Sequence, residues 1–235
     1  MKNLLAIDTS SQVLSMALKR AGAPIREIQV DGFLQHAENL LPVLKSLLKQ
    51  EKLELDAIDA FLIGRGPGSF TGLRIGFATL KGLIAVRKKP CFGALSFDMI
   101  ADNVPGPDQS YLTVCLDARR DKVFSRLYQR QKQKWRPKQK PQLLQIEAFK
   151  QQLPEPVQVT GDAMARYAEI LKKNMHNAVE ILPESLWRPR ASALIHFFEN
   201  QDTKLKPLTK PRDFIPLYFR LTEAEEKRTI HDVRC

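Results

Sequence analysis

The sequence predicts an α/β fold, because runs with strand character alternate with runs with helical character along most of the chain. Apolar strand-like runs end at Asp8 and at Ile63, and turn residues follow each of them. Residues 36–50 and 71–87 carry apolar side chains at helical spacing. A chain of 235 residues is long enough to bury a sizeable core, in one large domain or two small ones.

The individual elements follow from local patterns. Strands are expected over residues 4–9, 12–19, 25–30, 59–63, 90–95, 111–116, 123–128 and 157–160. Helices are expected over residues 36–50, 71–87, 96–102, 162–173 and 190–200. A loop rich in proline and glycine is expected over residues 103–108.

The stretch Gly64 to Gly76 reads Gly-Arg-Gly-Pro-Gly-Ser-Phe-Thr-Gly-Leu-Arg-Ile-Gly and is the most informative part of the chain. Its glycines let the backbone come close to another group, and Ser69 and Thr71 suit a helix N-cap. A strand, a glycine-rich turn and a helix N-terminus make a docking site for an anion or for backbone. A tight turn without a ligand is the alternative. No Gly-Lys-Ser/Thr follows, so this is not a Walker A loop.

A second polar turn lies at the end of the first predicted strand. Asp8, Thr9 and Ser10 occupy the turn of a predicted hairpin, a position that can hold phosphate in actin-like and sugar-kinase-like folds. Together with the glycine loop, this turn defines a candidate phosphate or nucleotide loop made of Asp8, Thr9, Ser10, Gly66, Gly68, Ser69, Thr71 and Gly72.

These segments together resemble the TsaB (YeaZ) family, which bacteria need to make threonylcarbamoyladenosine on tRNA. The matching segments are Ile7 to Ser10, His36 to Pro42, Gly66 to Gly76, Asp117 to Arg120 with Val123 and Phe124, and Pro216 to Arg220. The resemblance implies the actin-like ATPase fold (ASKHA, ribonuclease-H-like), with two similar lobes of which the second is smaller and degenerate. The expected lobes are residues 1–103, with the tail 214–235 packing back on them, and residues 104–213.

The resemblance also implies a role. It implies a non-catalytic scaffold subunit that binds and activates TsaD, the transferase that modifies N6 of adenosine 37. The ATPase TsaE would join the pair in a ternary complex, and the threonylcarbamoyl-adenylate synthase is a further candidate partner. In that case the candidate loop is degenerate, this chain holds no cofactor tightly, and ATP or ADP and a metal belong to the partner subunits. tRNA would be reached through the complex, and the chain alone could form a homodimer.

A partner face is expected on the helices over residues 36–50 and 71–87. Both carry broad apolar surfaces, and the second is apolar nearly all round, so it needs cover on more than one side. The family resemblance implies that they join two helices of TsaD in a four-helix bundle. Complete burial within the chain's own lobe is the alternative. The residues expected at this face are His36, Leu40, Leu41, Leu44, Leu47, Leu73, Phe77, Leu80, Lys81 and Ile84.

Catalytic and metal-binding patterns are missing from the sequence. The family member TsaD holds a metal with a His-x-x-x-His pair, whose side chains face one ion because they lie one helical turn apart. Here His36 is followed four residues later by Leu40. No Gly-x-Ser-x-Gly elbow occurs. We therefore expect no metal site, no catalytic residue and no peptidase activity. A stand-alone actin-like ATPase or carbamoyl transferase is an alternative function.

The net charge of +11 is concentrated in one stretch. Residues 119–150 contain eleven Lys or Arg and two acids, Asp121 and Glu147. We expect a flexible basic hairpin loop, whose cations could contact tRNA phosphates and whose one Trp could stack on a base. The alternatives are a solvated loop that maintains solubility and an independent tRNA-binding module. The expected contact residues are Arg130, Lys132, Lys134, Trp135, Arg136, Lys138 and Lys140.

The remaining features of the sequence indicate the cellular compartment of the protein. No apolar run approaches the roughly 18 residues of a membrane-spanning helix, and the first residues have no signal-peptide pattern. Three scattered cysteines, Cys91, Cys115 and Cys235, fit a reducing compartment better than a disulfide framework. The sequence therefore predicts a cytoplasmic protein that does not associate with membranes.

Overall fold

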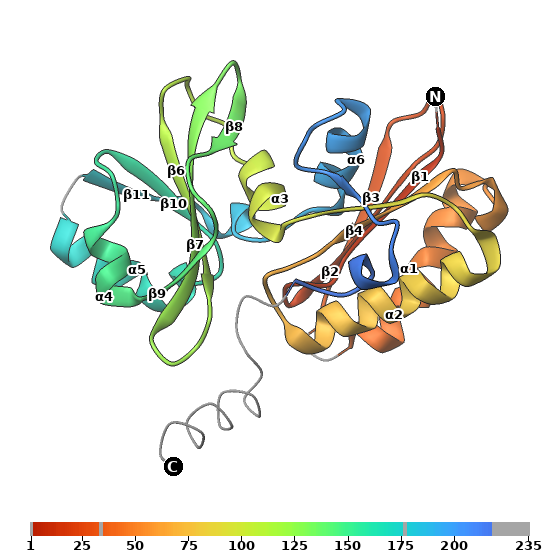
Figure 1. The fold of residues 1–235 in the computed structure, drawn as a ribbon, viewed down its shortest axis with the longest axis horizontal. Helices are drawn as coiled ribbons and strands as arrows, with labels where there is room; N and C mark the ends of the chain where they lie inside the picture. Colours follow the sequence, from red (N-terminus) through yellow and green to blue (C-terminus); the bar gives the residue numbers. More distant parts are fainter. Residues whose placement is uncertain (1, 33–34, 176–177, 218–235) are drawn as a thin grey trace, which may run out of the picture.

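Two β-sheets, each covered by helices, form two lobes that lie side by side (Figure 1). The computed structural model describes residues 2–32, 35–175 and 178–217. Within these residues every predicted strand and helix is present, with ends that shift by three residues at most. No helix in the described part of the chain is long and apolar enough to cross a membrane.

The sheet of the first lobe has six strands. They are β1 (Leu4–Asp8), β2 (Val13–Lys19), β3 (Ile25–Asp31), β4 (Ala60–Gly64), β5 (Cys91–Ala94) and β12 (Lys206–Pro207), in the order β12-β5-β4-β1-β2-β3. The β1–β2 and β2–β3 pairs are antiparallel, whereas β4 pairs in parallel with both β1 and β5. Because β1 and β4 are parallel neighbours, their C-terminal ends lie at the same edge of the sheet.

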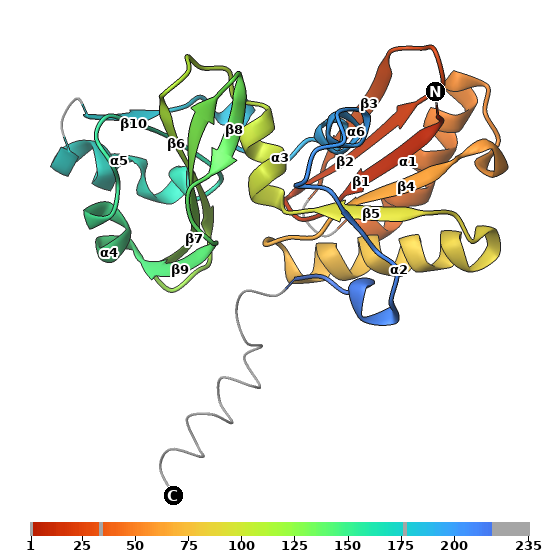
Figure 2. The same ribbon diagram turned by 45° about the horizontal axis from the view of Figure 1, so that its top comes forward.

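Helices bury both faces of this sheet. Helices α1 (His36–Glu51) and α2 (Phe70–Arg87) lie side by side on one face, and α6 (Ala191–Glu199) covers the other (Figures 1 and 2). The alternation of side chains along β1 separates the two cores. Leu5 and Ile7 pack with residues of α1 and α2, whereas Leu4 and Ala6 pack with residues of α6.

The second lobe repeats the pattern on a smaller scale. Its strands are β6 (Tyr111–Asp117), β7 (Lys122–Gln131), β8 (Lys134–Pro137), β9 (Gln142–Gln145), β10 (Val157–Thr160) and β11 (Val179–Ile181), and its helices are α4 (Ile146–Gln151) and α5 (Met164–Met175). The order β8-β7-β6-β10-β11, with β9 also on β7, matches the order β3-β2-β1-β4-β5 of the first lobe. In both lobes an antiparallel hairpin is extended by parallel strands. This repetition confirms the predicted two-lobed, actin-like α/β fold.

The short helix α3 (Ser96–Asp102) lies between the lobes (Figure 2). Phe97, Ile100 and Ala101 belong to the core beneath sheet strands β6 and β7, whereas Met99 packs with residues of α6 and β4. One face of α3 therefore packs against each lobe, so the helix connects the two lobes through buried side chains.

The expected boundary of the second lobe, residue 213, is wrong. The chain returns to the first lobe at α6, where Ala191, Leu194 and Ile195 pack against Leu4 and Ala6. Strand β12 then adds to the edge of the first sheet beside β5. The apolar residues of α6 explain the early return, because the second face of the first sheet would otherwise be exposed to water. Residues 218–235 of the expected tail lie outside the described residues.

The basic stretch forms the expected hairpin, but regular strands extend through residues that were expected to form its loop. Strand β8 pairs with β7 in the register Arg130 opposite Trp135 and Gln131 opposite Lys134. The two turn residues, Lys132 and Gln133, have positive φ values of 49° and 60°. This is the geometry of a two-residue hairpin turn, which usually requires Gly or Asn, so no turn signal marks this position in the sequence.

Candidate functional site

The glycine loop and the Asp-Thr-Ser turn meet at the C-terminal edge of the first sheet. The backbone amide of Ser69 donates a hydrogen bond to the carbonyl oxygen of Ser10 over 2.7 Å. The Ser96 hydroxyl donates to the Ser10 hydroxyl over 2.8 Å, and the Ser96 amide donates to the carbonyl of Gly66 over 2.8 Å. The segments after β1, β4 and β5 are therefore tied together in one polar corner.

The glycines of the loop are required for this close packing. A Cβ atom on Gly68 would overlap the carbonyl oxygen of Ser10, and a Cβ atom on Gly72 would overlap that of Thr9. A Cβ atom on Gly64 would overlap the carboxylate of Asp8. In this structure the space that the glycines leave open is occupied by the chain's own backbone and side chains. The loop thus has the shape of a phosphate-binding loop and is docked on a protein segment.

Asp8 lies at the centre of this corner and is completely buried. Its carboxylate accepts hydrogen bonds from the Ser10 amide at 3.0 Å and from the Ser10 hydroxyl at 2.9 Å. Burial raises the pKa of Asp8 to about 6, and the hydrogen bonds from Ser10 only partly offset this effect. Thr9 and Ser10 are also buried. These three side chains are thus almost completely shielded from solvent.

Ser69 serves as the N-cap of α2. Its hydroxyl oxygen accepts a hydrogen bond from the Gly72 amide at 3.1 Å, which satisfies one of the free amides of the first helical turn. The neighbouring Thr71 is exposed and makes no cap. The predicted capping role is confirmed for Ser69 alone.

The side chain of His36 is buried. It is only 5% exposed, and its Nε2 lies 2.9 Å from the carbonyl oxygen of Ser11. A carbonyl can only accept, so Nε2 must carry the proton and donate it. The ring also lies against the position that a side chain on Gly72 would occupy. His36 therefore fixes the start of α1 to the Asp-Thr-Ser turn, and its assignment to a partner face is wrong.

Most of the other residues expected at a partner face are also buried in the first lobe. Seven of the ten are at most 5% exposed, namely His36, Leu40, Leu44, Leu47, Leu73, Phe77 and Leu80. They form the core between α1, α2 and the sheet, apart from His36 and Leu73. The expectation fails for these residues because the stripes that look like an interface are the stripes that face the sheet. Leu41 and Lys81 remain exposed, and Ile84 is half-buried.

The exposed surface of the two helices combines the expected residues Leu41 and Lys81 with others that the sequence analysis did not assign to the partner face. Phe70, one of the latter, is 40% exposed, and Leu41 is 51% exposed. The Arg74 guanidinium lies over the Phe70 ring, 3.9 Å from its centroid. Ala78 and Gly82 are also exposed, and a Cβ atom on Gly82 would meet nothing within 4 Å. Setting aside the residues of α2 that face the core (Leu73, Phe77, Leu80 and the half-buried Ile84) would have identified its outer stripe. Together with Leu41 of α1, this stripe forms the α1–α2 outer face (Leu41, Phe70, Arg74, Ala78, Lys81 and Gly82).

The basic hairpin differs from expectation in the role of its aromatic residue. Trp135 is 3% exposed, and its indole Nε1 donates a hydrogen bond to the carbonyl of Val104 at 2.8 Å. Arg130 donates to the same carbonyl at 3.1 Å and lies over the indole ring. These two residues anchor the hairpin, so they are unavailable for stacking on a base or for binding phosphate. The other expected contact residues are exposed, namely Lys132, Lys134, Arg136, Lys138 and Lys140.

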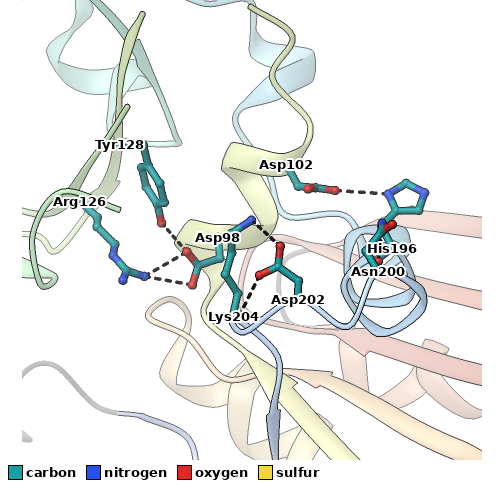
Figure 3. A network of polar contacts seen from close by, with 8 residues as sticks. All are labelled: Asp98, Asp102, Arg126, Tyr128, His196, Asn200, Asp202 and Lys204. Atoms are coloured by element: carbon teal, nitrogen blue, oxygen red, sulfur yellow. Dashed lines mark hydrogen bonds and ion pairs between the residues drawn. The ribbon is translucent and has the colours of Figure 1, made fainter. Parts of the chain in front are cut away.

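A polar network joins the lobes around α3 (Figure 3). The buried carboxylate of Asp98 accepts hydrogen bonds from Arg126 at 3.0 Å and from the Tyr128 hydroxyl at 2.9 Å, both on β7. At the other end of α3, the Asp102 carboxylate lies 3.3 Å from Nδ1 of His196 on α6. The hydrogen bond that Asp102 accepts from the imidazole raises the pKa of His196. Among the described residues no group of three or more His, Cys, Asp or Glu side chains is arranged to hold a metal ion.

Comparisons with known proteins agree with this geometry. The family described as "TsaD: tRNA N6-adenosine threonylcarbamoyltransferase" matches residues 33–227. The protein of Bacillus subtilis (strain 168) named "tRNA threonylcarbamoyladenosine biosynthesis protein TsaB" is 27% identical over 95% of this chain and 96% of its own length. The Haemophilus influenzae protein of the same name is 29% identical over 78% of this chain and 82% of its own length.

A solved structure gives the same answer for the fold. The structure "YeaZ from Pseudomonas aeruginosa" superposes with a TM-score of 0.76 at 25% identity, over 93% of this chain and 100% of that one. The matched regions include both lobes and the glycine loop. The chain therefore belongs to the TsaB (YeaZ) family, within the broader family described by the transferase TsaD.

Proposed function

We propose that this chain is a non-catalytic subunit in the synthesis of threonylcarbamoyladenosine on tRNA, and that it binds and activates the transferase TsaD. The observation that carries the proposal is that the polar corner is buried and filled by the chain itself. Asp8, Thr9 and Ser10 are buried, and the glycine loop is packed against them. A nucleotide-processing centre needs an accessible site, so the chemistry belongs to a partner.

The α1–α2 outer face is the surface that we assign to TsaD. It exposes the apolar side chains of Leu41 and Phe70 on two adjacent helices, together with the small residues Ala78 and Gly82. Small residues let a second pair of helices approach closely, as in a helix bundle. The chain would activate TsaD by binding its transfer-competent conformation more tightly than its other conformations. TsaE and tRNA would then act on the assembled pair.

Reconstitution tests the role. Modified tRNA is measured with TsaD, TsaE and the threonylcarbamoyl-adenylate synthase, in the presence and absence of this chain. We expect product only when this chain and TsaD are both present. Product formation that does not depend on this chain would refute the scaffold role, and product formed without TsaD would favour a stand-alone transferase.

The surface is tested with matched substitutions. Phe70→Glu places a charge on the outer face, whereas Ile170→Glu places one at a similarly exposed position on α5, since the two residues are 40% and 39% exposed. We expect Phe70→Glu and Ala78→Glu to weaken TsaD binding by roughly ten-fold or more, and Ile170→Glu to leave it unchanged. Equal effects at both positions would exclude this face.

A further inference from the structure

A row of exposed cations runs along the outer strand of the second lobe. Strand β8 and the residues around it expose Lys132, Lys134, Arg136, Lys138 and Lys140, which we call the basic ribbon. No acidic residue occurs in the sequence between Asp121 and Glu147. The hairpin that carries the ribbon projects from the second lobe on the side of α3 (Figure 1). The ribbon is thus a local concentration of positive charge on an accessible edge.

The register of the hairpin orders these charges. Gln131 lies opposite Lys134 and Gln129 lies opposite Arg136. The Lys138 ammonium donates to the Gln129 side chain at 3.2 Å. Lys134, Arg136 and Lys138 therefore share one face of the hairpin with the two glutamine amides, and Trp135 points to the opposite face, into the core. Alternate residues of a strand lie about 6.6 Å apart, a spacing comparable to that of neighbouring phosphates along an RNA strand.

Within the described residues the ribbon cations form no ion pair, although Lys134 interacts electrostatically with the carboxylate of Asp202. Elsewhere in the second lobe, Arg126 pairs with Asp98 and Arg166 pairs with Asp121. Among the described residues no carboxylate lies within ion-pair distance of the five ribbon cations, and the nearby Asp108 carboxylate accepts the Gln133 amide instead. Cations on an edge strand also prevent strands of two molecules from pairing, which is the structural alternative.

Two side chains of the hairpin anchor it to the segment that follows α3. The Trp135 indole and the Arg130 guanidinium both donate to the carbonyl of Val104, and the Arg130 side chain covers the indole ring. The charges are therefore displayed on a rigid support, which lowers the entropy cost of binding a linear polyanion.

We propose that the basic ribbon binds the phosphodiester backbone of RNA, through Lys134, Arg136 and Lys138, without reading its sequence. The proposal rests on the role in tRNA modification proposed above. None of the exposed large apolar side chains in the described residues, Leu41, Phe70, Ile170 and Ile215, lies on the hairpin. A lipid surface is therefore a poorer fit than RNA, since the ribbon has no group to insert among acyl chains.

The experiment compares two charge-matched variants of the full chain. The triple variant Lys134→Gln, Arg136→Gln, Lys138→Gln removes ribbon charge, whereas Lys45→Gln, Lys49→Gln, Lys172→Gln removes three exposed cations elsewhere. Binding of a fluorescent tRNA transcript is measured by anisotropy over a series of salt concentrations. We expect the ribbon variant to bind roughly ten-fold more weakly at low salt, and the slope of log K against log salt to fall in magnitude by about 2. The control variant should behave like the unmodified chain.

Other outcomes separate the explanations. Equal losses in both triples would overturn the proposal, because only net charge would then matter. Competition by polyglutamate as effective as that by tRNA would overturn it as well, because the ribbon would be a general polyanion or acidic-protein site. TsaD binding is measured in parallel. If the ribbon variant binds tRNA normally and also recruits TsaD, the RNA-binding proposal is refuted and the proposed function is not. If the unmodified chain never recruits TsaD, the proposed function is refuted.

Discussion

The carbonyl oxygen of Ser10 accepts the backbone amide of Ser69 over 2.7 Å, and this bond closes the glycine loop onto the turn after the first strand. The bond joins two segments that lie far apart in the sequence. It can form only because Gly68 has no side chain, since a Cβ atom there would overlap the same carbonyl. A loop with the pattern of an anion site is thereby used to stabilise the lobe itself.

Two glycines of α2 provide the sharpest test of this packing. Gly72→Ala should destabilise the protein by about 2–3 kcal/mol, because its Cβ atom would overlap the backbone carbonyl of Thr9, which cannot move freely. Gly82→Ala on the same helix should stabilise it by about 0.5–1 kcal/mol, because the new Cβ atom meets nothing within 4 Å and alanine is the better helix former. Chemical denaturation of both variants measures the difference. Similar free energies of unfolding would contradict the close docking of the loop.

The buried charge of Asp8 predicts an unusual pH dependence. Its pKa in the folded protein, about 6, lies above the ordinary value of 3.8, so folding favours the protonated form. The free energy of unfolding therefore includes a contribution from Asp8 that is full below about pH 4, declines as the pH rises, and is lost above about pH 6. At pH 8 the buried carboxylate therefore costs up to about 3 kcal/mol.

Asp8→Asn removes this charge while keeping an oxygen that can accept from Ser10. We expect the variant to unfold at a higher temperature than the unmodified chain at pH 8, and the difference to shrink towards pH 5. Thermal melts across this range provide the measurement, with the exposed Glu54→Gln as control. A gain that does not change with pH would show that the charge of Asp8 is not the cause.

The contact between Asp102 and His196 predicts a second pH dependence of the same sign, centred at a higher pH. The hydrogen bond that the His196 imidazole donates to the Asp102 carboxylate raises the pKa of His196. A raised histidine pKa contributes stability that is full below about pH 6.5 and is lost as the pH rises through the folded-state pKa. The His196 side chain is half exposed, so the contribution should stay below about 1 kcal/mol.

Asp102→Asn should therefore lower the melting temperature more at pH 6 than at pH 8.5. The same substitution in a His196→Gln background should lose this pH dependence, which makes the pair a double-mutant cycle. If the effect of Asp102→Asn is the same in both backgrounds, the two residues are not coupled.

The fold could be predicted in detail because its signals are local. The apolar run before Asp8, the glycine stretch after Ile63 and the helical spacing of residues 36–50 each define an element on their own. The β7–β8 hairpin could not be predicted in this way. Its turn is made by Lys132 and Gln133 in a conformation that neither residue favours, and it is stabilised by the distant contact between Trp135 and Val104.

The residues that make up the candidate site could be predicted from the sequence, but their exposure to solvent could not. The sequence correctly grouped Asp8 and Ser10 with the glycine loop, since parallel strands place these segments at one edge. Whether Leu44 or Leu80 faces a partner or the sheet depends on which side of each helix the sheet lies, and apolar spacing alone does not distinguish a partner from the chain's own sheet. Phe70 was missed because it lies beside, and not within, the main apolar stripe.

The early return of the chain to the first lobe has a consequence for protein synthesis. The amide of Ala191 donates to the Ser15 hydroxyl over 2.8 Å, and the Ser192 hydroxyl donates to Glu27 over 2.9 Å. A ribosome releases β1 to β5 well before it releases α6, so the nascent first sheet has one face without cover until almost the entire polypeptide has emerged. The inserted second lobe, in contrast, is contiguous and can form while translation continues. The lobe that begins the chain is therefore the last to be completed.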